Sequence, residues 1–312
     1  MELDISSLFS SSMEYGERIE RDIFEANREL LEAVQNKFRR EQEEGYDTLA
    51  KNLRAWSKSH ERKEDIQAVI DVANDIRENF EAEAFVVVGI GGSDLGTRTI
   101  HQALNPWYHN LMSREERGNA PMLFFTGDSF DPAPLYNLLQ MLKSRGILDR
   151  TIFNVISKSG TTTETVAAFL IIKDFLEKHL RKRGIGEEHY AEQIVATTGL
   201  NRKSVLYTLN EKQRIKFRAM LPVPDGVGGR FSFASPVGLL TLAVSANDRK
   251  ESVETRVKNA MQGLKDGEKD LYSDVFDRRN IAYQLALINK MYEEKGKNII
   301  AVSYTHLTLP TN

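Results

Sequence analysis

Two loops rich in glycine and hydroxyl side chains most constrain how this chain can fold. The first is G-I-G-G-S-D-L-G at residues 89–96, and the second is S-K-S-G-T-T-T-E-T at residues 157–165. Each follows an apolar run typical of a strand and opens a segment typical of a helix. The carboxyl ends of parallel strands form the ligand crevice of an α/β sheet, and exposed amides at a helix start attract anions. The pair therefore predicts an α/β fold that binds a phosphorylated small molecule.

The middle of the chain alternates between predicted strands and predicted helices. An amphipathic helix with apolar positions from Ile66 to Phe80 leads into the unbroken apolar run at 85–89. Further strands are predicted at 122–125, 151–156 and 193–197, and helices at 134–142 and 164–180. Repeated βα units with near-continuous apolar strands favour a doubly wound parallel sheet over a sandwich.

The two ends of the chain differ from this middle part. Residues 1–60 are predicted to form a charged helical extension, and residues 61–246 a first α/β domain that ends in an apolar core helix at 235–246. Further helices are predicted at 251–264 and 281–291, and a strand from Asn298. We expect one apolar stripe of the extension to pack on the domain that follows it. The stripe consists of Ile19, Ile23, Ala26, Leu30, Val34 and Phe38.

The composition argues against several kinds of partner. The 42 Lys and Arg nearly balance the 45 Asp and Glu, which leaves a net charge of −3, so no surface for nucleic acid or anionic membrane is predicted. Without cysteine, disulfides and thiolate metal sites are impossible. Residues 1–12 carry no signal pattern, and no apolar run approaches membrane-spanning length. We therefore expect a cytoplasmic protein with a small-molecule partner.

The first loop departs from the common nucleotide-binding patterns. Asp94 breaks G-x-G-x-x-G, and Thr97 and Arg98 stand where a P-loop has Lys and Ser or Thr. What remains is a glycine-rich turn in which a ligand can approach the backbone of Gly92, with Ser93 able to bond a hydroxyl or phosphate oxygen. A tight strand-to-helix turn without a ligand is the alternative.

The second loop is more specific, because it holds Lys158 and five hydroxyls within seven positions. Thr161 and Glu164 have the spacing of a capping box, so plain helix initiation explains part of the pattern. That reading leaves Ser157, Ser159, Thr162 and Thr165 without a role. Hydroxyls and amides around a helix start suit a dianionic phosphoryl group.

A third motif, D-G-V-G-G-R-F-S, spans residues 225–232. Its glycines would let a substrate approach the backbone. Arg230 carries a permanent positive charge and could stabilise an oxyanion that develops in a reaction. The alternative is a surface or salt-bridged arginine beside a flexible turn.

In combination, the three motifs resemble those of the glucose-6-phosphate isomerase family in its shorter bacterial form. The resemblance rests on G-I-G-G-S-D-L-G, I-S-K-S-G-T-T-T-E-T and V-G-G-R-F-S-F-A-S-P-V-G-L-L in that order, and it extends to about residue 300. It implies a sugar-isomerase fold with three αβα layers, built from two doubly wound domains that face each other. It also implies a homodimer for the full-length protein.

The resemblance also assigns roles to residues. Arg230 matches the arginine that steadies the enediolate when glucose 6-phosphate and fructose 6-phosphate interconvert in glycolysis and gluconeogenesis. Such an isomerisation needs no metal or redox cofactor, and the six His are scattered outside any motif. The residues that match substrate-binding positions are Gly92, Ser93, Ser157, Lys158, Ser159, Gly160, Thr161, Thr162, Thr165 and Gly229.

The chain departs from the family pattern after about residue 300. The family's proton-shuttling Glu, ring-opening His and a Lys lie beyond the last matching position. We expect residues 302–312 to be a non-native tail, so that His306 is no catalytic acid, and residues 247–301 to begin a truncated second domain. Without the base we expect little or no turnover. Residues 281–300 are expected to expose apolar surface.

Two rival functions stay open. A non-catalytic module that binds sugar phosphates would need both loops but not Arg230 in its V-G-G-R-F-S setting. An isomerase acting on mannose or amino-sugar phosphates would have much the same phosphate loop. Turnover of these substrates by a completed chain would separate the isomerases.

Overall fold

The computed structural model describes residues 20–43 and 54–296. These fall into two compact units, 20–43 with 262–296 and 54–261. All three motifs belong to the larger unit. The predicted tail, His306 and the predicted strand at Asn298 lie outside the described residues. The domain boundaries expected after residues 60, 246 and 301 stay predictions.

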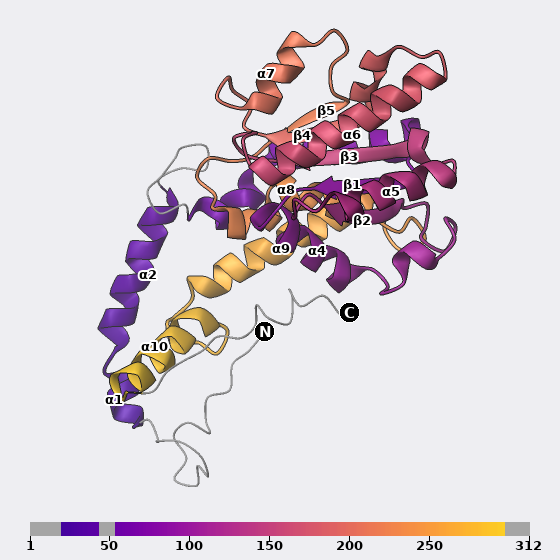
Figure 1. Ribbon diagram of the computed structural model, residues 1–312. Coiled ribbons are helices and arrows are strands. Elements are labelled where there is room, and N and C mark those ends of the chain that lie inside the picture. Colours follow the sequence, from indigo (N-terminus) through magenta and orange to yellow (C-terminus); the bar gives the residue numbers. More distant parts are fainter. Residues whose placement is uncertain (1–19, 44–53, 297–312) are drawn as a thin grey trace. The chain divides into compact units, whose positions relative to one another are not determined.

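A five-stranded parallel sheet forms the centre of the larger unit (Figure 1). In spatial order its strands are β2 (Met122–Thr126), β1 (Ala84–Val88), β3 (Thr151–Ile156), β4 (Ile194–Thr198) and β5 (Ala219–Pro222). Every neighbouring pair is parallel, and Val86 of β1 stands opposite Phe124 on one side and Phe153 on the other. All residues of β1, β3 and β4 are buried, as strands covered on both faces must be. The predicted doubly wound parallel sheet is confirmed.

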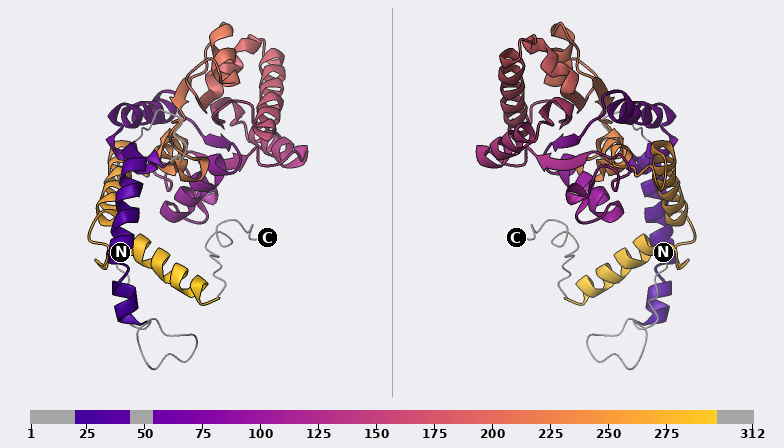
Figure 2. Two further views of the ribbon diagram at one scale, coloured as in Figure 1. Left: turned by 90° about the vertical axis from the view of Figure 1, so that its left-hand side faces the viewer. Right: turned by 90° about the vertical axis from the view of Figure 1, so that its right-hand side faces the viewer.

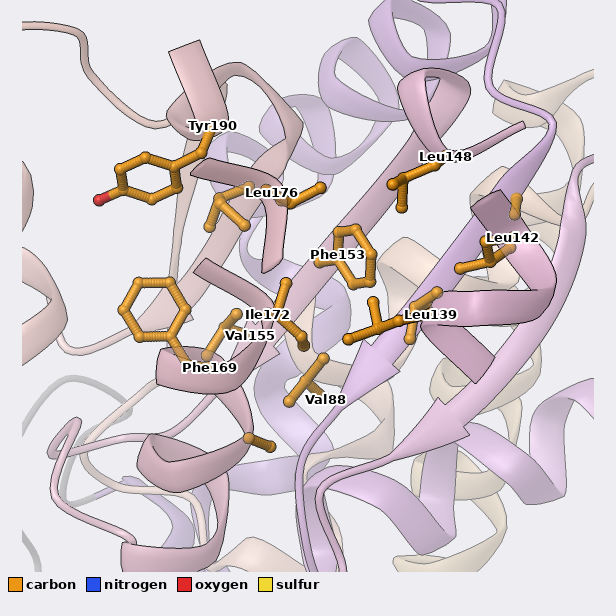
Figure 3. Close-up of a cluster of buried hydrophobic side chains, with 14 of the residues drawn as sticks. Val88, Leu139, Leu142, Leu148, Phe153, Val155, Phe169, Ile172, Leu176 and Tyr190 are labelled. Atoms are coloured by element: carbon orange, nitrogen blue, oxygen red, sulfur yellow. The ribbon is translucent and has the colours of Figure 1, made fainter. Parts of the chain in front are cut away.

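Helices cover both faces of this sheet. On one face, α5 (Pro132–Ser144) and α6 (Thr163–Lys182) bury their apolar stripes against Val88, Phe153 and Val155 (Figure 3). Leu206 of α7 (Val205–Lys212) joins the same cluster. On the other face lie α3 (Lys63–Asn74), α4 (Gly92–Leu104) and α8 (Pro236–Val244), with α3 and α6 on opposite sides of the sheet in Figure 2. Because side chains alternate along a strand, Phe85 and Val87 point to this second face.

Two elements of the larger unit were missing from the sequence prediction. Helix α7 has eight residues, and β5 has four, of which only Leu221 is buried. Elements this short give too few turns or alternations for a periodic pattern to stand out. The larger unit also contains short 3₁₀ helices, among them η2 (Ala55–Glu61), η4 (His109–Leu111) and η7 (Gly229–Ala234).

The smaller unit contains α1 (Arg21–Glu25), α2 (Arg28–Glu43) and α10 (Ile281–Glu294), and α9 (Val253–Leu271) ends in it. Phe24 and Leu31 pack here in an apolar cluster with residues of α10. The predicted stripe is therefore wrong in its register: Ile23, Leu30 and Val34 are 53%, 43% and 45% exposed. The helix is interrupted between α1 and α2, and a different set of residues faces the partner helix.

The expectation of exposed apolar surface at 281–300 is also wrong where the structure describes it. Within α10, four large apolar side chains are at most 8% exposed, and Leu285 is the exception at 47%. The four are Tyr283, Leu287, Ile288 and Met291. They are covered because Phe24 and Leu31 of the chain's opening helices pack on them. Residues 297–300 lie outside the described part.

Candidate active site

The first two motifs leave adjacent strands at the same edge of the sheet. Residues 89–91 follow β1, residues 157–162 follow β3, and these two strands pair directly. In the order β2-β1-β3-β4-β5, the chain winds outward in opposite directions from β1 and β3. Such a reversal of strand order is the point at which doubly wound sheets bind their ligands. The sheet therefore brings both loops to the expected ligand crevice.

The predicted site residues lie in three places at this edge. Two begin α4, one lies in the first turn of α6, two open η7, and the others form the loop after β3. In the same order they are Gly92 and Ser93; Thr165; Gly229 and Arg230; and Ser157, Lys158, Ser159, Gly160, Thr161 and Thr162.

The hydroxyls of the second loop bond to one another. Ser157 Oγ lies 3.1 Å from Thr162 Oγ1, and Ser159 Oγ lies 2.6 Å from Thr161 Oγ1. The amide of Gly160 donates to Ser157 Oγ over 3.1 Å. The alternative capping box at Thr161 and Glu164 does not form: α6 has its N-cap at Thr162, which makes no side-chain cap, because its hydroxyl is paired with Ser157. The first turn of α6 thus keeps its amides clear of a side-chain cap at Thr162, as an anion site requires.

Thr165 is the one assigned hydroxyl that is deeply buried without a partner among the described residues. It is 1% exposed, and its Oγ1 has no hydrogen bond there. A buried hydroxyl without a partner is costly, so such atoms in native proteins call for an explanation. Thr165 lies in the first turn of α6, where a bound anion would accept its hydrogen bond.

The loop is fixed from behind by the residues after β4. Thr198 Oγ1 donates to the carbonyl of Ser157 over 2.6 Å, and the amide of Val205 donates to the carbonyl of Ser159 over 3.1 Å. Gly160 has a φ of +66°, and a Cβ there would lie 2.8 Å from the amide nitrogen of Leu206. Only glycine fits this position. Sequence reasoning missed Thr198, although a hydroxyl pair at the carboxyl end of β4 was a signal that could have found it.

Glycine backbones join the first motif to the third. A Cβ on Gly92 would lie 2.1 Å from the carbonyl oxygen of Gly229, so α4 and η7 meet without side chains between them. Ser232 Oγ donates to the same oxygen over 2.8 Å. Gly91 has a φ of +59°, which a residue with a side chain adopts with strain. The glycines of the first loop therefore serve the turn and this packing.

An ion pair joins the second motif to the third. Lys158 Nζ donates to the carbonyl oxygen of Asp225 over 2.9 Å and lies 3.4 Å from its carboxylate Oδ1. Arg230, five positions further along, is exposed and has no ion pair or hydrogen bond among the described residues. The salt-bridged alternative for Arg230 is thus not what the described structure shows. Its guanidinium is left for a ligand or for solvent.

A buried carboxylate beside the first loop was noted in the sequence only for breaking a pattern. Asp94 is 3% exposed, and burial raises its pKa, opposed by the nearby charge of Arg98. Arg98 Nε donates to Asp94 Oδ2 over 2.7 Å, and Arg98 Nη2 to Asp128 Oδ2, after β2, over 3.3 Å. This network ties the start of α4 to the loop after β2. The i,i+4 spacing of Asp94 and Arg98 on a predicted helix could have indicated this ion pair from the sequence.

Fold and site together define an α/β protein with a candidate ligand site at the switch point of a doubly wound sheet. A family model described as phosphoglucose isomerase matches residues 12–294. The chain belongs to the phosphoglucose isomerase family.

Curated relatives show the same kinship. The chain is 36% identical over 243 residues to a glucose-6-phosphate isomerase of Shouchella clausii, a match that covers 78% of this chain and 48% of the relative. It is also 36% identical over 247 residues to one of Pediococcus pentosaceus, covering 78% and 50%. The chain therefore spans about half the length of the curated relatives it matches.

Solved structures share the fold. A glucose-6-phosphate isomerase from Chlamydia trachomatis superposes with a TM-score of 0.63 at 20% identity, over 90% of this chain and 52% of that one. A hypothetical protein from Thermus thermophilus superposes with a TM-score of 0.67 at 24% identity, over 88% of this chain and 55% of that one.

Within the described residues, no helix is both long and apolar enough to cross a membrane.

Proposed function

We propose that this chain supplies the sugar-phosphate-binding part of an isomerase that interconverts glucose 6-phosphate and fructose 6-phosphate. The observation that carries the proposal is the meeting of three motifs at one switch point, joined by Gly92 against Gly229 and by Lys158 on Asp225. The curated relatives, which are named glucose-6-phosphate isomerases, support the same substrate pair.

In this proposal the phosphoryl group binds at the start of α6. The dianion would accept hydrogen bonds from the first-turn amides and from loop hydroxyls, with Thr165 gaining the partner it lacks among the described residues. Lys158 would add a positive charge at the same loop. The sugar would extend toward Ser93 at the start of α4. Each of these groups binds and orients the substrate.

Arg230 would act on the reacting atoms. Isomerisation moves a proton between C1 and C2, and the intermediate carries negative charge on the oxygens of those carbons. A guanidinium with permanent charge, free of other partners in the described structure, suits that oxyanion. We assign no residue of this chain as the base, and positioned proton transfer contributes about a hundred- to ten-thousandfold. We therefore propose that the 312-residue chain binds substrate but turns it over slowly or not at all.

Binding and turnover together test the proposal. Calorimetry should show that fructose 6-phosphate binds and fructose does not. Arg230→Gln should lower the affinity for fructose 6-phosphate. Arg214→Gln should leave that affinity unchanged, because the Arg214 side chain is 87% exposed and lies outside the motifs. Equal binding of fructose and its phosphate would contradict the proposal. Normal turnover in a coupled assay would refute slow catalysis.

A non-catalytic sugar-phosphate module is the second candidate, favoured by the lack of an assigned base. It predicts that Arg230→Gln leaves fructose 6-phosphate affinity unchanged. We also propose a homodimer for the full-length protein and a cytoplasmic setting, which the lack of cysteine suits. Mannose 6-phosphate and amino-sugar phosphates, titrated beside fructose 6-phosphate, address the remaining isomerase alternative.

A further inference from the structure

We propose that residues 54–56, here called the strap, position the loop at 225–231 that carries Arg230, and that Trp56 is the positioning residue. This inference rests on the proposed function, because it concerns how Arg230 is held for the sugar. The strap belongs to none of the three motifs.

The strap contacts the loop along its backbone. Arg54 and Val227 form an antiparallel bridge, and the amide of Ala55 donates to the carbonyl of Gly226 over 3.2 Å. Ala55 and Val227 are each 2% exposed and form a small apolar cluster against which Trp56 packs. These contacts tie the first half of the loop to the strap through a single β-bridge and one further backbone hydrogen bond.

Trp56 holds the other end of the loop through an aromatic stack. Its ring lies over that of Phe231, with 5.7 Å between the ring centroids and 17° between the planes. Phe231 directly follows Arg230 and is still 43% exposed, so solvent covers much of its ring. The stack with Trp56 therefore restrains this side chain, while its amide is held by the carbonyl of Gly228 over 2.9 Å.

Arg230 consequently lies between two fixed neighbours. Gly229 on one side is packed against Gly92, and Phe231 on the other is stacked on Trp56. Arg230 itself has no side-chain partner among the described residues, so the direction of its guanidinium depends on how its backbone is held. Loss of orientation at a reacting or binding group weakens its action even when the group is still present.

The phosphate loop does not depend on the strap in this way. Its backbone is held by Thr198 and Val205, after β4, and by its own hydroxyl pairs. The Lys158 side chain does bond Asp225, but this is the end of the loop at 225–231 that lies away from Phe231, the residue stacked on Trp56. Removal of the Trp56 ring should therefore loosen the loop at 225–231 and leave residues 157–165 in place. Inorganic phosphate, which needs only the second loop, and fructose 6-phosphate, which also reaches Arg230, separate the two effects.

The test compares Trp56→Ala, Trp56→Phe and the control Trp107→Ala in the 312-residue chain. Trp107 is the other tryptophan and is 82% exposed. We expect Trp56→Ala to lower the affinity for fructose 6-phosphate about three- to tenfold, which is the effect expected for the loss of one aromatic stack. The affinity for inorganic phosphate should be unchanged. Trp56→Phe should keep most of the wild-type affinity for fructose 6-phosphate, and Trp107→Ala should change neither affinity.

Hydrogen exchange gives a readout that needs no ligand. In Trp56→Ala, amides at 226–231 should exchange faster while those at 159–165 keep their wild-type rates. Unchanged exchange at 226–231, or equal weakening of both ligands, would overturn the strap as a positioning device. If the wild-type chain binds phosphate but not fructose 6-phosphate, the proposed function fails, and the exchange rates alone decide whether the strap holds the loop.

Discussion

Thr165→Val should stabilise the ligand-free protein and weaken phosphate binding at the same time. Valine has nearly the shape of threonine but no hydroxyl. In the wild-type chain, Thr165 Oγ1 is buried and has no partner among the described residues. A buried polar group without a partner costs about 1–3 kcal/mol, so the substitution should raise the free energy of unfolding by about 1 kcal/mol or more.

The effect on binding should have the opposite sign. A hydrogen bond to a charged group is worth about 1.5–3 kcal/mol, which corresponds to a loss of about ten- to 150-fold in affinity for inorganic phosphate. Urea unfolding measures the first quantity, and calorimetry with phosphate measures the second. Thr163→Val is the matched control, because Thr163 begins the same helix and is exposed.

Opposite signs are what distinguish a binding hydroxyl from a structural one. Substitution of a purely structural hydroxyl would lower the free energy of unfolding. The affinity for phosphate would then fall only because part of the protein is unfolded. If Thr165→Val lowers stability by about 1 kcal/mol, or leaves phosphate affinity unchanged, Thr165 does not contact the phosphoryl group.

Three further substitutions or conditions test the packing and charge around the site. Gly92→Ala should cost about 1–3 kcal/mol in urea unfolding, because the new Cβ would meet Gly229 O at 2.1 Å, whereas Gly263→Ala, with open space around it in a helix, should stabilise slightly. Burial lowers the pKa of His101 from 6.5 to about 4, so its neutral form stabilises the fold above pH 6.5. That contribution, about 3 kcal/mol at most, should vanish as the pH falls from 6.5 to 4, and His101→Gln should flatten the urea-unfolding profile across that range. Asp225→Asn removes a carboxylate beside the phosphate loop, so inorganic phosphate should bind about two- to fivefold tighter at low salt, and unaltered affinity would argue against a phosphate there.

Local patterns in the sequence were enough to place most of the larger unit. The predicted strand at 151–156 coincides with β3, that at 122–125 ends one residue before β2 does, and that at 193–197 is shifted by one residue from β4 at both ends. Strands β3 and β4 are buried along their whole length, so their apolar runs are nearly unbroken and short-range information suffices. The loops after β1 and β3 could also be predicted to suit phosphate, because their glycines and hydroxyls lie within a few consecutive residues.

The same local reasoning failed where a partner outside the pattern decided the outcome. The capping box at Thr161 did not form, because the Thr161 hydroxyl is paired with Ser159 and α6 has its N-cap one residue later, at Thr162. In the opening helices, Phe24 and Leu31 are buried rather than Leu30 and Val34, because α10 packs on that side. Amphipathic spacing indicates that a helix has an apolar face, but the packing partner selects which residues it covers.

The sequence alone thus determined the α/β class, the parallel sheet and the residue types suited to phosphate, since these depend on periodicity and turn chemistry within short segments. Only the tertiary structure decided that the three motifs converge. Ser232 and Gly92 lie 140 positions apart yet meet at the same edge, and Lys158 bonds Asp225 across 67 positions. Such contacts come from strand order and helix packing, which no local pattern encodes, and they turn three separate motifs into one candidate site.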